Sequence, residues 1–100
     1  MKFAEDLRVI AGAHEEDGEY EVAQQLYRRA LKAQSRLIGK DDPELAPYIY
    51  DLAMISAALD RDAEARDLFA WLVAIVPQDA ELLKEVELVL SELQDAPSAA

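Results

Sequence analysis

The chain has 100 residues, of which 52% are hydrophobic and 31% are charged, with no cysteine and a formal net charge of −11. This length and composition favour a single helix-rich globular domain and exclude disulfides and thiolate metal sites. The excess of acids disfavours binding to nucleic acids and to anionic membranes.

The N-terminal segment predicts a helix from about residue 2 to residue 16. Phe3, Leu7, Ile10 and His14 recur at spacings of three and four, which is typical of one helix face. Acidic residues interrupt the apolar run, so we expect no secretory signal here, and no segment has the length of a membrane span. We therefore expect a soluble, cytoplasmic protein.

A second helix is predicted from about residue 19 to residue 38. Gly18 separates it from the first helix, and Gly39 ends it. Residues 28–40 carry five bases and no acid, whereas the segments on both sides are acidic. This basic segment is either a solvated helix face, whose cations suit a helix C-terminus, or a local contact site.

Three more helices are predicted in the rest of the chain. Asp41 or Asp42 suits the N-cap of the third helix, and Pro43 suits its first turn. Pro77 ends the fourth helix, because the residue before a proline avoids helical geometry, and Asp79 suits the N-cap of the fifth. These helices and a final flexible tail are expected over residues 43–59, 62–76, 80–93 and 96–100.

The pattern of apolar residues occurs twice along the chain, at a constant offset. Leu7 falls on Ile49, and Tyr27 falls on Phe69. Further small and apolar residues of the first two helices fall on similar residues of the third and fourth. Repetition at a period of this kind is typical of proteins built from stacked helix pairs.

The repeated residues resemble those of tetratricopeptide repeats. The second helix of the first copy has Ala23, Tyr27 and Ala30, and the second copy has Ala65 and Phe69 at the matching positions, followed by a late proline. The 42-residue period and the segment GKDDPE are similar to the kinesin-light-chain variant of this family. The resemblance covers most of the chain.

The resemblance implies an all-α fold of tetratricopeptide-like helical hairpins. The first repeat would cover residues 3–38, the second would cover residues 43–77, and a C-terminal capping helix would follow over residues 80–93. The single domain would span residues 1–95, with the helices stacked into a right-handed superhelix. Proteins of this family act in protein–protein interaction, so the resemblance also implies a non-enzymatic function.

The first helices of stacked pairs line a concave groove, and the register places residues of the first, third and fifth helices there, among them Asp51. Tyr50, Met54 and Leu88 would form an apolar floor, with Arg8 and Gly12 beside it. Acids flank this floor, so it suits an extended or helical peptide with apolar anchors and basic residues. The family's groove for acidic peptides uses lysines and asparagines, and this chain has no asparagine, so that specificity is not expected.

At an offset of 34 residues from the second copy, Ile49 falls on Leu83 and Ala53 on Glu87, so the fifth helix corresponds to a first helix that lacks its partner. Leu83 and Leu90 would pack on that partner in a complete repeat. Either a second copy of the chain or a partner's helix covers them, or the fifth helix turns and buries them internally. Trp71 occupies an outward position and is either an interface anchor or half-buried against its own fold. A homodimer is one expectation.

No catalytic set of residues emerges. His14 is the only histidine, and no nucleophile and base are suggested. The segment DRDAE lacks the glycine and the distal glutamate of a calcium loop, so neither a metal nor a cofactor is expected. The sequence predicts an interaction module for a protein or peptide. Its alternatives are a small acidic chaperone, similar to those of bacterial secretion systems, and a purely structural homo-oligomerisation module.

Overall fold

A computed structural model describes residues 3–94 of the chain, and within this range it contains helices and no strands. This confirms the predicted all-α fold, with two helix pairs followed by a terminal helix. The predicted tail, residues 96–100, lies outside the described residues. The elements are α1 (Phe3–Glu16), α2 (Tyr20–Ile38), the 3-10 turn η1 (Pro43–Leu45), α3 (Ala46–Ala58), α4 (Asp62–Ile75) and α5 (Ala80–Gln94).

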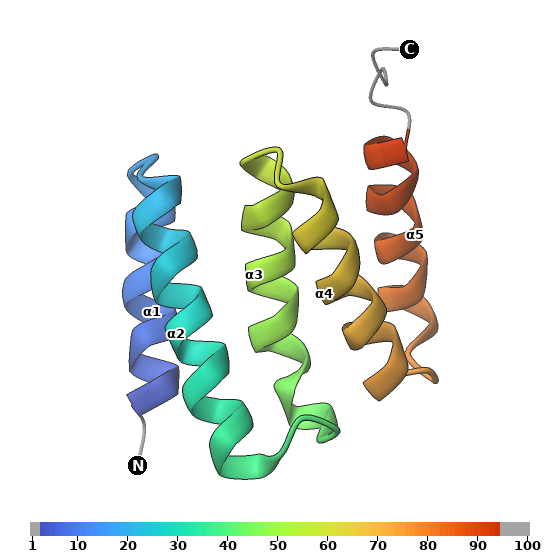
Figure 1. Cartoon of the computed structure of the whole chain (residues 1–100), viewed down its shortest axis with the longest axis horizontal. Coiled ribbons are helices and arrows are strands. Elements are labelled where there is room, and N and C mark those ends of the chain that lie inside the picture. Colours follow the sequence, from blue (N-terminus) through green and yellow to red (C-terminus); the bar gives the residue numbers. More distant parts are fainter. Residues whose placement is uncertain (1–2, 95–100) are drawn as a thin grey trace.

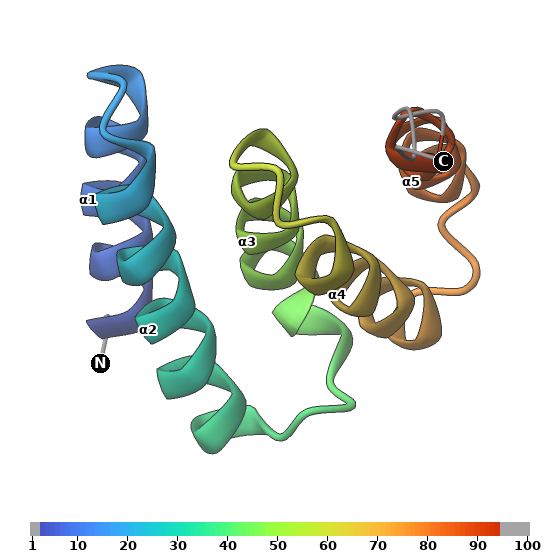
Figure 2. The same cartoon turned by 45° about the horizontal axis from the view of Figure 1, so that its top comes forward.

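The helices form a row in the order of the sequence. The α1–α2 and α3–α4 pairs stand side by side, and α5 follows α4 at the far end of the row (Figure 1). Seen from the second direction, α1, α3 and α5 lie along one side of the row and α2 and α4 along the other (Figure 2). Each helix therefore packs mainly on helices that are close to it in sequence.

The two helix pairs turn in the same way. In each turn a backbone N–H donates to a carbonyl oxygen five residues earlier, over 2.9 Å. The residue just before that donor has a positive φ, 79° at Gly18 and 61° at Asp60. These two residues have the same offset as Leu7 and Ile49, so the repeat register is present in the backbone as well as in the side chains.

The connection between the pairs differs from the predicted single helix that starts at Pro43. The Asp42 side chain accepts a hydrogen bond from the Glu44 N–H over 2.8 Å, as expected of a cap. The helix that it caps, however, is only a 3-10 turn, and α3 starts after it. Pro47 is the reason, because it has no N–H to donate to the Pro43 carbonyl and its ring crowds that oxygen.

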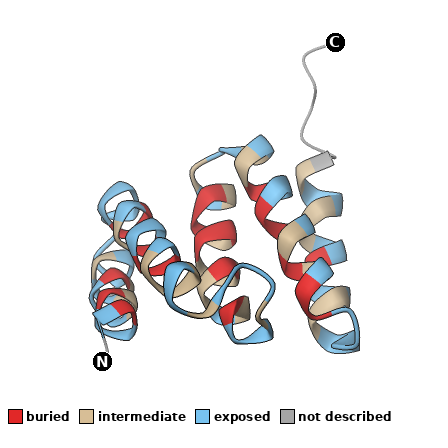
Figure 3. Cartoon of the chain, turned by 60° about the horizontal axis from the view of Figure 1, so that its bottom comes forward, coloured by how far each residue is buried: buried red, intermediate tan, exposed pale blue. Residues whose placement is uncertain are grey.

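The core lies between the helices and follows the repeat register (Figure 3). Tyr27 and Phe69 are buried at matching positions of α2 and α4. Small residues surround them and allow the helix axes to approach closely. The alanines without exposed surface are Ala11, Ala23, Ala30, Ala53 and Ala65.

A polar network joins the two helix pairs. Gln24 of α2 is buried and donates to the Ser56 hydroxyl of α3 over 3.1 Å. Arg61 bonds to the Gln24 side-chain oxygen, and Arg28 forms an ion pair of 2.7 Å with Glu64. The pairs are therefore held in register by specific polar contacts as well as by apolar packing.

Candidate functional site

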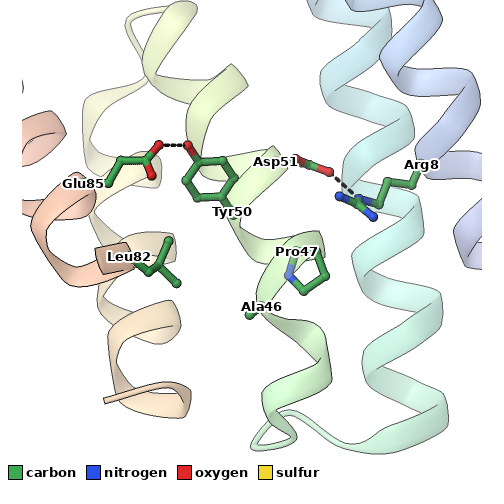
Figure 4. Close-up of a pocket in the computed structure, with 7 residues that line it drawn as sticks. All are labelled: Arg8, Ala46, Pro47, Tyr50, Asp51, Leu82 and Glu85. Carbon is green, nitrogen blue, oxygen red and sulfur yellow. Dashed lines mark hydrogen bonds and ion pairs between the residues drawn. The ribbon is translucent and has the colours of Figure 1, made fainter. Parts of the chain in front are cut away.

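The first helices of the fold border an open cleft of about 360 Å³ (Figure 4). A second cleft, of about 350 Å³, shares two of its residues. Because α1, α3 and α5 all contribute, the first cleft runs across both helix pairs and the terminal helix. Its lining residues are Arg8, Ala46, Pro47, Tyr50, Asp51, Leu82 and Glu85.

Arg8 of α1 is held against α3 by two contacts. Its guanidinium forms an ion pair with Asp51, and its Cζ atom lies 5.6 Å from the centre of the Tyr48 ring. Burial raises the pKa of Asp51 above its usual value, and the positive charge of Arg8 partly offsets this rise. An arginine has five N–H donors, so Arg8 keeps donors for a further acceptor.

Tyr50 links α3 to α5 across the cleft. Its hydroxyl donates to the Glu85 carboxylate (Figure 4). Burial and this hydrogen bond raise the pKa of Tyr50 to about 12. The Tyr50 ring, Pro47 and Leu82 supply apolar surface beside the carboxylates of Asp51 and Glu85. The cleft therefore combines an apolar floor with two acids and one base.

The five predicted groove residues do not all meet in the clefts. Arg8 and Tyr50 line the same cleft. Met54 is half-buried and packs against the core, one turn after Tyr50. Leu88 is exposed and lines neither cleft. The described structure thus brings two of these residues together and leaves Leu88 on the open surface of α5.

Gly12 lies beside the second cleft. A Cβ atom at this position would be 3.7 Å from the Tyr27 hydroxyl oxygen, which is an ordinary contact distance. That hydroxyl donates to Glu15 over 2.7 Å, and burial together with this bond raises the pKa of Tyr27. The second cleft is lined by Arg8, Val9, Tyr27 and Asp51.

Sequence reasoning missed several lining residues, although the repeat register contained a signal for two of them. Asp51 was expected to face the groove. Its counterparts in the repeat register are Val9 of α1 and Glu85 of α5. Both line a cleft. Applying the groove position of Asp51 to all three first helices would therefore have predicted that Val9 and Glu85 line a cleft.

The predicted interface residues lie at two places. Trp71 is half-buried, and its Nε1–H donates to the carbonyl oxygen of Lys40 over 2.7 Å, which attaches the α2–η1 loop to α4. Leu83 and Leu90 are half-buried on α5, and Leu90 packs against the core. A role of these residues in an oligomer stays a prediction.

The described residues offer little for metal binding or membrane insertion. Within residues 3–94, no group of three or more acidic or histidine side chains is placed to hold a metal ion. His14 lies at the α1–α2 turn, with its Nδ1 atom 2.7 Å from Glu19 Oε1. None of the described helices has both the length and the apolar character needed to cross a bilayer.

Comparison with known proteins identifies a family. The family model described as "Tetratricopeptide repeat" matches residues 6–78, which span both helix pairs. Comparison with curated proteins gave no match, and comparison with solved structures gave none. Repeats of this kind generally mediate protein–protein interactions and are typically non-enzymatic scaffolds. The kinesin-light-chain variant stays a prediction. The match covers well over half of the chain, which therefore belongs to the tetratricopeptide repeat family.

Proposed function

We propose that the chain is an interaction module that binds a peptide segment of a partner protein along the side formed by α1, α3 and α5. The observation that carries this proposal is the open cleft to which all three first helices contribute, with Arg8, Tyr50 and Glu85 from one helix each. A peptide in this cleft would contact both helix pairs and the terminal helix at once. Concave surfaces of helical repeats serve such binding.

The lining residues favour a peptide with an apolar anchor and a basic residue. Pro47, Leu82 and the Tyr50 ring would receive the apolar side chain. Glu85 accepts one hydrogen bond from Tyr50, and a carboxylate has about four acceptor positions. A lysine or arginine of the peptide would use the remaining positions. The net charge of −11 also attracts basic partners at low ionic strength.

Selection of peptides from a displayed random library tests this proposal. We expect the selected sequences to combine a lysine or arginine with a large apolar residue. A labelled synthetic peptide of that sequence would then be titrated with the protein, with fluorescence anisotropy as the readout. Tyr50→Ala and Leu82→Asp should each weaken binding by at least roughly tenfold, since each removes apolar contact surface from the cleft.

Asp67→Ala is the matched control, because Asp67 is exposed on α4, a second helix. This variant should bind the peptide as the unmodified chain does. The proposal is wrong if the selected peptides lack basic residues. It is equally wrong if Tyr50→Ala and Leu82→Asp bind the peptide with unchanged affinity.

A further inference from the structure

The outer side of the first helix pair is apolar and uncovered by any other part of residues 3–94. Phe3 and Ile10 of α1 are 51% and 48% exposed, whereas their counterparts in the second repeat, Leu45 and Leu52, are 0% and 3% exposed. The difference arises because α2 packs on η1 and α3 and covers the later pair. The second pair buries the matching positions under α2, whereas no helix within residues 3–94 covers them on the first pair.

Helix α2 extends this surface and adds positive charge. Val22 and Leu26 lie on the side of α2 opposite Gln24, which contacts α3. Arg29 and Arg36 follow Val22 at intervals of seven residues, so they share its side, and both are exposed. We call this surface the α1–α2 end face, made of Phe3, Ile10, Val22, Leu26, Arg29, Arg36 and Leu37.

Helix α5 has the complementary combination at the other end of the molecule. Leu83, Glu87 and Leu90 occupy positions at which α3 has three residues without exposed surface. On α5 the two leucines are only half-buried and Glu87 is exposed. The counterparts of Glu87 are the buried alanines Ala11 and Ala53. A helix that packs on this α5 flank (Leu83, Glu87 and Leu90) therefore needs a base opposite Glu87.

We propose that the α5 flank of one copy docks on the α1–α2 end face of a second copy, head to tail. Leu83 and Leu90 are seven residues apart, about 10.5 Å along the helix, and Phe3 and Ile10 have the same spacing. Glu87 lies between the two leucines and would face the arginines of the end face. Of the charges on α2 and α5, Arg28 pairs with Glu64 and Glu85 bonds to Tyr50, which leaves Arg29 and Arg36 for Glu87.

The same charges argue against a symmetric pairing of two α5 flanks. Such a pairing would place the two Glu87 carboxylates close together, with Lys84 as the one nearby base on each α5. This is less favourable than a contact in which arginines face Glu87. A head-to-tail contact instead leaves one free face on each terminal copy, so the assembly grows with concentration. Because exposed charges contribute, added salt should weaken the contact.

A charge swap between the two surfaces tests the proposal. One variant carries Glu87→Arg, and the other carries Arg29→Glu together with Arg36→Glu. We expect the mass of the unmodified chain, measured by sedimentation velocity at low salt, to rise with concentration. Each variant alone should associate at least roughly tenfold more weakly, because like charges then face each other. An equimolar mixture should recover association, since every contact between the two variants pairs opposite charges.

Glu81→Arg is the matched control, because it changes the same charge on the side of α5 away from Leu83 and Leu90. It should associate as the unmodified chain does. Circular dichroism checks that every variant keeps its helices. The proposal is overturned if the unmodified chain is a monomer at every concentration, if the mixture stays dissociated, or if Glu81→Arg has the effect of Glu87→Arg.

Discussion

The side-chain nitrogen of Gln24 donates to the Ser56 hydroxyl oxygen over 3.1 Å, and both side chains are buried. This bond joins the second helix of one pair to the first helix of the next. Its loss is costly because a buried partner is left unsatisfied.

Gln24→Ala should lower the free energy of unfolding by about 1–3 kcal/mol, because Ser56 then loses its partner and Arg61 loses an acceptor. Urea denaturation followed by circular dichroism measures the change. Gln25→Ala is the control, since Gln25 is the exposed neighbour on the same helix. Equal stabilities of the two variants would contradict a structural role for the Gln24–Ser56 bond.

Asp60→Gly should stabilise the fold, by up to about 1 kcal/mol. Asp60 has a φ of 61°, a conformation that costs free energy for a residue with a Cβ atom and little for glycine. Gly18→Ala at the matching position of the first pair should have the opposite sign, with a loss of about 1–2 kcal/mol. Thermal melts of the two variants check both signs, and a lower melting temperature for Asp60→Gly would contradict the argument.

Alkaline pH should destabilise the chain above pH 10. The pKa of Tyr50 rises from 10.0 to about 12 on folding, because of burial and the bond to Glu85. Between these values the folded chain keeps a proton that the unfolded chain loses, so the free energy of unfolding falls as pH rises. Tyr50→Phe should show a smaller fall in urea denaturation across this range. A steeper fall than that of the unmodified chain would contradict the assignment.

Trp71→Phe should weaken the attachment of the α2–η1 loop without changing self-association. The substitution removes the Nε1–H that donates to the Lys40 carbonyl, and a bond of this kind is worth about 0.5–1.5 kcal/mol. Chemical denaturation measures the stability, and sedimentation velocity measures the association. A variant with unchanged stability and lower mass would instead identify Trp71 as part of an interface.

Helix periodicity and the repeat register predicted most of the fold. Helix α3 is apolar on nearly all sides, so its orientation followed from its match with α1. The positions of Tyr27 and Phe69 fixed the register of the pairs, and small residues around them identified the contacts. The α2–α3 connection was predicted less well. Pro47 lies early in a helical segment, and a propensity argument does not say whether the preceding turn stays α-helical or tightens to a 3-10 turn.

The candidate site was predicted only in part, because periodicity gives the side of a helix but not its rotation against its neighbours. Tyr50 and Arg8, two of the expected groove residues, line the cleft. Leu88 was expected there as well, but the rotation of α5 is set by the burial of Val86, and this rotation brings Leu82 and Glu85 to the cleft. Contacts between helices, rather than patterns within one helix, determine such details.

The packing of each helix on its neighbours in sequence has a consequence for how the chain is made. Local contacts allow fast folding, and α1 and α2 can pair before the rest of the chain exists. The side of α2 that carries Gln24 stays exposed until α3, the next long helix, is complete. At about 5–20 residues per second, a nascent chain would present this partly polar face to the cell for roughly 1–4 s.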